Sequence, residues 1–124
     1  MRIATIACVL TFASAAAFSA GCGSSFPPPN DQWAAAQTDI GRAEAGGAPG
    51  VPNAALHLQL AKEDLTKSKG LIDHDNQRAA DLIAVAQAEA QLALSLAKQQ
   101  AAQDQAQKAQ DDLAKAKSAA GGGQ

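Results

Sequence analysis

One long uninterrupted stretch most constrains how this chain can fold. From the turn at residues 73–76 to Ala120 it contains neither glycine nor proline, and alanine and glutamine are its commonest residues. Alanine is the best helix former, whereas glycine and proline are the residues that end helices. The stretch therefore predicts one helix, which would be roughly 65 Å long if straight at 1.5 Å per residue. Asp73 or Asp75 is the expected N-cap.

The two halves of this predicted helix differ in composition. The first half is apolar, with Leu82, Ile83, Val85, Ala86, Ala90, Ala93, Leu94, Leu96 and Ala97. The second half is rich in Ala, Gln and Lys, and its apolar residues recur at spacings of four and three, which is a short heptad pattern. These residues form the candidate partner face: Ala102, Ala106, Ala109, Leu113 and Ala116. Asp104–Lys108 and Asp111–Lys115 are expected to pair at i,i+4 along the second half.

Two shorter helices are predicted before the long one. The first runs from a cap at Asn30 or Asp31 to about Ala45, and the Gly46–Gly50 loop breaks it. The second starts near Pro52 and ends at Gly70, and its apolar residues also recur at alternating spacings of four and three, as one buried face requires. The face of the first helix comprises Trp33, Ala36, Ile40 and Ala43; that of the second comprises Ala54, Leu58, Ala61, Leu65 and Ser68. On the solvent side of the second helix, Glu63 and Lys67 are expected to pair.

These elements predict an all-α fold: a three-helix unit with a long, partly projecting C-terminal helix. The first two helices are too short to cover the third, so its second half must project as a solvated helix, pair with another copy or meet a partner. Large apolar side chains are few, so the core is thin and hydrophobic burial is modest.

The N-terminus predicts secretion and lipid attachment. Arg2 precedes an apolar run at residues 3–18, and the small residues Ser19, Ala20 and Gly21 lead to Cys22. This is the order of a secretory signal, and it resembles a bacterial lipobox in which Cys22 receives acyl chains, palmitate among them. Gly23 after the cysteine fits sorting to the outer membrane. The alternative is an ordinary signal that is cleaved earlier.

The resulting organisation has five parts. They are a lipoprotein signal peptide (1–21), a lipidated cysteine with a Pro-rich tether (22–29), a helical domain (30–101), an Ala/Gln/Lys-rich helical extension (102–120) and a disordered tail (121–124).

Composition argues against several classes of function. The chain holds 10 Lys and Arg against 12 Asp and Glu, without a clustered basic face, which disfavours nucleic acid as a partner. The two cysteines, Cys8 and Cys22, would be lost with the signal or consumed by the lipid, which leaves no thiol for catalysis or zinc.

Candidate catalytic and metal sites are weak. Glu63 and Asp64 are adjacent carboxylates, but neighbouring helical residues point about 100° apart. Asp73, His74 and Asp75 are better explained as a capping turn than as metal ligands, so we expect no catalytic, cofactor or metal site.

The helical region resembles a known family. From Trp33 to Ala101 the chain is similar to small bacterial lipoproteins called domain of unknown function 4398, through the lipidated cysteine and the segments ALHLQLAKEDLTKSK and RAADLIAVAQAEAQLALSLAK. Ser68 stands where that pattern would have alanine. The family has no established catalytic residue, so the resemblance implies none. The second and third helices also resemble one tetratricopeptide-like hairpin, as packing geometry only.

Together these observations predict a non-enzymatic, lipid-anchored protein of the cell envelope, on the periplasmic side of the outer membrane. It would act as a structural or interaction module, with the membrane and either an envelope protein or a second copy as partners. The alternative is a periplasmic chaperone-like carrier that binds an envelope polypeptide between the second and third helices.

Overall fold

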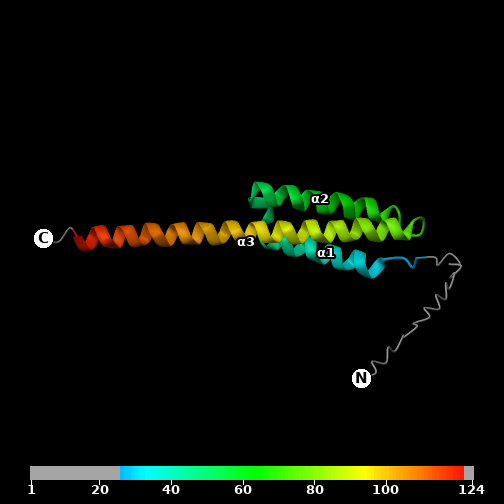
Figure 1. The fold of residues 1–124 in the computed structure, drawn as a ribbon, viewed down its shortest axis with the longest axis horizontal. Coiled ribbons are helices and arrows are strands. Elements are labelled where there is room, and N and C mark those ends of the chain that lie inside the picture. The colour runs from blue at the N-terminus through cyan, green and yellow to red at the C-terminus, as the bar shows by residue number, and fades with distance from the viewer. Residues whose placement is uncertain (1–25, 122–124) are drawn as a thin grey trace, which may run out of the picture.

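A computed structural model describes residues 26–121 and confirms the all-α fold. The elements are α1 (Asn30–Ala45), the short 3-10 helix η1 (Ala48–Gly50), α2 (Pro52–Lys69) and α3 (Asn76–Gly121). Figure 1 shows α3 as the axis of the molecule, with α2 along one side of its first half, α1 along the other, and the remainder projecting. Cys22 and the rest of the predicted signal lie outside the described residues.

The helix boundaries follow from local chemistry, with two corrections. Gly121, predicted as the first residue of the disordered tail, is the last residue of α3, and residues 122–124 lie outside the described residues. Neither Asn30 nor Asp31 is the N-cap of α1: Asn30 is already helical, and the Pro29 carbonyl accepts the first hydrogen bond, from the Trp33 amide at 3.0 Å. Proline fits at this position because its φ is fixed close to the helical value.

The end of α1 depends on two glycines. A Cβ added to Gly46 would lie 3.0 Å from the Arg42 carbonyl oxygen and would displace the end of the Leu94 side chain, so glycine allows Leu94 to pack against this position. Gly47 has φ of 88°, a left-handed conformation that glycine adopts without cost. The chain then turns through η1 into α2, where Pro52 occupies the first turn as predicted.

The turn between α2 and α3 confirms Asp75 as the N-cap of α3. Its Oδ1 accepts a hydrogen bond from the Arg78 amide at 3.1 Å, three residues later, as a capping carboxylate should. Gly70 follows α2 at its C-cap, but in a right-handed conformation (φ −70°). Asp73 is the residue of this turn that adopts the left-handed conformation, with φ of 70°.

Alanines form the contact between the helices. The buried residues of α2 and α3 alternate at spacings of four and three, and we call this contact the alanine seam. Its members are Ala54, Leu58, Ala61, Leu65 and Ser68 on α2, and Ala79, Ile83, Ala86, Ala90, Ala93 and Ala97 on α3. On α1, Ala36, Ile40 and Ala43 are buried against the same core, with Trp33 partly buried beside them, as predicted.

Small side chains let the helix backbones approach closely, but they bury little area each. Ile40, Leu58, Leu65 and Ile83 are the large aliphatic residues of this core. Each contributes about 1.5–3 kcal/mol when buried. Ser68 is fully buried, and its hydroxyl donates to the Leu65 carbonyl at 2.7 Å, so a polar residue at an alanine position leaves no unpaired group.

The three predicted i,i+4 ion pairs are replaced by other partners. Lys67 pairs with Asp64 at 3.0 Å rather than with Glu63. Glutamine side chains four residues earlier donate to Asp104 (from Gln100) and Asp111 (from Gln107) at 2.9 Å, and Lys115 lies 3.9 Å from Asp112. A glutamine amide at i−4 competes directly with a lysine at i+4 for the same carboxylate.

Candidate interaction surfaces

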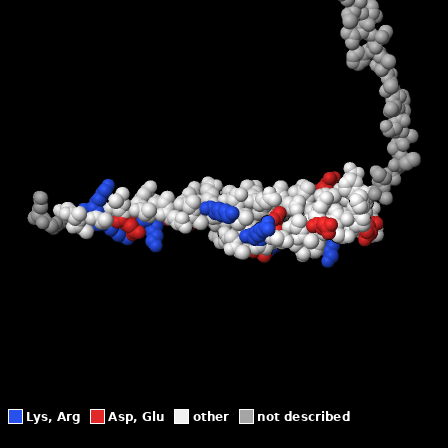
Figure 2. Space-filling model, turned by 90° about the horizontal axis from the view of Figure 1, so that it is seen from below, with Lys and Arg blue, Asp and Glu red and all other residues white. Residues whose placement is uncertain are grey.

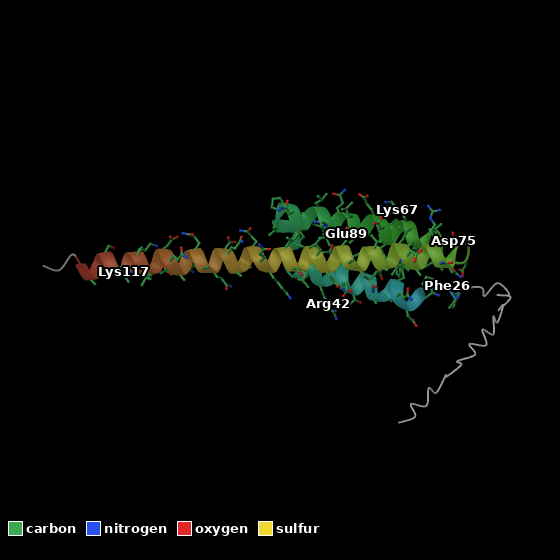
Figure 3. The ribbon with its side chains drawn as sticks, viewed as in Figure 1. Phe26, Arg42, Lys67, Asp75, Glu89 and Lys117 are labelled. Atoms are coloured by element: carbon green, nitrogen blue, oxygen red, sulfur yellow. The ribbon has the colours of Figure 1, made fainter. Side chains whose placement is uncertain are left out.

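The described chain starts at the end of the molecule farthest from the projecting helix. Asn76, at the start of α3, joins two segments there: its Nδ2 donates to the Phe26 carbonyl and its Oδ1 accepts from the Asp73 amide, both at 2.7 Å. Figure 3 shows Phe26 and Asp75 together at one end and Lys117 at the other. A tether that leads into Phe26 therefore enters at the opposite end from the tip of α3.

The projecting segment comprises residues 98–121, every one of which is exposed. It contains the whole predicted partner face, and Leu113 has 56% of its area exposed. Within residues 26–121, the structure places Ala102, Ala106, Ala109, Leu113 and Ala116 in the projecting part of α3, where all five are exposed. Whether a partner binds there stays a prediction.

An open groove lies between α1 and α2, not between α2 and α3 as expected. The predicted site is filled by the alanine seam, in which Leu58 is only 4% exposed. The groove has a volume of about 1010 Å³. Its apolar lining includes Trp33, Ile40 and Leu65, and its charged residues are Glu44, Lys62 and Lys69.

The polar groups at this groove are mostly paired. Lys62 Nζ lies 2.5 Å from Glu44 Oε1, which joins α2 to α1 across the groove. The Trp33 indole N–H donates to the Leu65 carbonyl at 3.3 Å. Lys69 Nζ lies 5.4 Å from the Trp33 ring centroid, a cation–π distance that places a positive charge at one end. Figure 2 shows the molecule from the α1 side, with separated charges rather than a basic or acidic patch.

A second surface, which the sequence did not reveal, lies on the side of α2 and α3 away from α1. We call it the leucine face: Leu56 (56% exposed), Leu60 (36%), Val85 (46%) and Leu92 (42%), bordered by the partly exposed Leu82 and Leu96. Val85 was predicted among the apolar residues of α3 without a direction. Because alanines occupy the buried positions, these larger side chains remain outside.

A histidine–carboxylate pair marks the middle of that face. His57 Nδ1 of α2 lies 2.5 Å from Glu89 Oε2 of α3, with about a quarter of each side chain exposed. The two residues are 32 positions apart, so helical spacing alone gives no signal for this contact. The pair fixes the register of the two antiparallel helices.

The candidate catalytic carboxylates serve structural roles. Asp64 hydrogen-bonds Lys67 and raises the pKa of that ammonium above its usual 10.5, while Glu63 accepts from Gln59 at 3.0 Å. In the 73–75 turn, Asp75 caps α3 and the His74 amide donates to the Leu71 carbonyl at 3.0 Å. Within residues 26–121 no three His, Cys, Asp or Glu side chains are grouped as a metal site would need.

By length and composition alone, α3 is the one described helix that qualifies as a membrane span. Core helices of soluble proteins also satisfy that criterion, and α3 buries its alanine seam against α2 and α1.

The fold thus defines a class: an all-α unit of three helices whose last helix extends well past the other two. Comparison with protein-family models, curated proteins and solved structures gave no significant match. The resemblance to domain of unknown function 4398 stays a prediction.

Proposed function

We propose that this chain is a non-enzymatic lipoprotein of the cell envelope that presents an interaction helix at a distance from its membrane anchor. The observation that carries the proposal is that the start of the described chain and the projecting segment lie at opposite ends of the molecule. The described chain begins beside Asn76, whereas residues 98–121 project from the other end of α3. At 1.5 Å per residue the 46-residue α3 is about 69 Å long.

The anchor of this proposal is a thioether-linked lipid on Cys22. The segment before it has the charge, apolar run and small residues of a secretory signal. Confinement to one surface raises the effective concentration of a partner in the same membrane. We place the protein on the periplasmic side of the outer membrane, with the partner face on the projecting segment.

The anchor is tested by mass spectrometry of the mature N-terminus and by fractionation. We expect a diacyl or triacyl mass on Cys22, and release of Cys22→Ala from envelope vesicles. An unmodified chain that begins upstream of Cys22, or Cys22→Ala that pellets as firmly as the original, contradicts the proposal.

The partner face is tested with a photo-crosslinking amino acid at Ala109, and at Asp111 as the matched control. Two residues along a helix are about 200° apart, so the control presents the opposite side of the same segment. We expect a discrete crosslinked product from position 109 only. Equal products from both positions, or none, contradict a specific partner face.

The groove between α1 and α2 favours a second candidate function, that of a carrier for an unfolded envelope polypeptide. Gly41 lines this groove, and a Cβ there would meet nothing within 4 Å, so Gly41→Trp should fill it without disturbing the fold. The matched control is Ala88→Trp, at an exposed position of α3 outside the groove lining. A carrier would lose its suppression of outer-membrane-protein aggregation in Gly41→Trp alone.

A further inference from the structure

The leucine face is an unpartnered apolar surface built by two helices. On α2, Leu60 is one turn from His57, and on α3, Val85 and Leu92 are one turn before and after Glu89. The groove side of α2 bears Lys62, Leu65 and Thr66, and α1 contacts α3 through Asp39, which accepts from Gln91. The leucine face and α1 therefore occupy different sides of the α2–α3 pair. Figure 3 shows Glu89 and Lys67 away from Arg42 of α1.

The large aliphatic side chains of the leucine face are exposed to water, which is unfavourable for apolar groups. Four of them expose more than a third of their area, while the buried positions of the same two helices are mostly alanines. Exposed apolar patches of this kind commonly mark protein contacts.

The charges at the edge of the leucine face indicate that a second copy of this chain covers it. Starting from the His57–Glu89 pair, Lys67 is ten residues along α2 and Asp81 is eight residues back along the antiparallel α3. They therefore lie at nearly the same level, about 3 Å apart along the helix axis. Both are exposed, and within the described residues Asp81 has no ion pair. Lys67 uses one of its three N–H groups for Asp64.

We propose that two copies of this chain dimerise through the leucine face, with a two-fold axis parallel to the helices. This rotation places α2 of each copy beside α3 of the other. The contact between Lys67 and the partner copy's Asp81 therefore occurs twice in the dimer. The same operation matches the apolar residues, because Leu60 and Val85 lie within one residue of the same level and Leu56 and Leu92 within two. Each helix then has only antiparallel neighbours, as in a four-helix bundle.

The polar pair in the middle of the face is compatible with this contact. His57 and Glu89 already satisfy each other at 2.5 Å, as do Lys67 and Asp64 at 3.0 Å, so neither carboxylate enters the interface unpaired. An axis perpendicular to the helices would instead bring Lys67 to the level of Gln99 and Gln100, where no carboxylate is available.

The experiment is directed disulfide formation in the full chain with Cys8→Ser and Cys22→Ser. This background lacks the lipidated cysteine, so the result does not depend on the proposed function. Copies with Leu56→Cys and one tag are mixed with copies carrying Leu92→Cys and a second tag, then oxidised. The matched control combines Arg42→Cys with Gln37→Cys on the α1 side. We expect a two-tag dimer from the first mixture at many times the yield of the control.

Charge exchange separates the proposed dimer from random contact. Lys67→Glu should reduce the crosslinked yield several-fold, and Lys67→Glu with Asp81→Lys should restore it. Leu60→Asp should abolish it, whereas Leu113→Asp on the projecting segment should not, with circular dichroism confirming that both variants fold. Equal yields from the leucine-face and control mixtures, or no recovery in the charge exchange, overturn the proposal.

Discussion

The two halves of α3 are one continuous helix, yet alanine has a different role in each. In residues 76–97 most of the buried positions are alanines, which let α1 and α2 approach closely. In residues 98–121 every residue is exposed, and alanine stabilises the helix through its intrinsic propensity alone. Alanine is therefore part of the core in one half and of a solvated helix in the other. The difference lies in the larger apolar residues of the first half and in α1 and α2, which pack beside it.

The two halves of α3 should differ most in stability when a fully buried side chain is truncated in one and an exposed side chain in the other. Ile83 is fully buried, so Ile83→Ala should lower the free energy of unfolding by about 2–5 kcal/mol. The matched variant Leu113→Ala, at an exposed position, should change it by less than about 0.5 kcal/mol. Urea denaturation followed by circular dichroism measures both. Equal effects would mean that the projecting segment is packed in solution.

Enlarging an alanine sharpens the distinction between the two roles. Ala90 lies in the alanine seam with no exposed area, so Ala90→Leu should cost about 1–3 kcal/mol through overpacking. Ala109→Leu, in the projecting segment, should be neutral in the monomer. If Ala90→Leu proves neutral in the same denaturation series, the close approach of α2 and α3 is wrong.

A helix breaker in the projecting segment separates local from global stability. Ala106→Pro removes a backbone donor and costs roughly 3 kcal/mol of local helix stability. Helical signal should fall, and amides beyond residue 106 should exchange faster with solvent, while the midpoint of core unfolding stays the same. A lower midpoint would show that the two halves unfold as one unit.

The smallest expected effect concerns the raised pKa of Lys67. Asp64 raises the pKa of Lys67, so the folded state holds this proton more tightly than the unfolded chain does. The stabilisation is present below the ordinary pKa of 10.5 and is lost as the pH rises through the folded value. Lys67→Met should remove a small decline in stability above pH 10.5, whereas Lys115→Met should leave that decline unchanged. A titration of the thermal midpoint that is identical for Lys67→Met and the original chain would contradict this.

Much of the fold could be predicted because helix periodicity is a local property. The alternating spacing of Ala54, Leu58 and Ala61 identified the buried side of α2 without knowledge of its partner, and the glycines at 46 and 47 marked the end of α1. The cap of α1 was predicted wrongly because three prolines supply a carbonyl and a fixed φ that make a polar cap unnecessary.

The surfaces were harder to predict because they depend on how helices sit around one another. Val85 and Ile83 are equally apolar, and only the position of α2 and α1 decides which of them is buried. The His57–Glu89 contact and the location of the groove are long-range in the same sense. The projection of the second half of α3, by contrast, was predictable, because the first two helices are too short to cover the third.

The clamp made by Asn76 has a mechanical consequence. Its amide fastens Phe26 to the first turn of α3, so tension between residue 26 and the tip of the rod enters α3 along its length. While this single exposed hydrogen bond holds, the load acts along α3 and bypasses α1 and α2. Without the clamp, the same force would peel α1 from its neighbours one turn at a time.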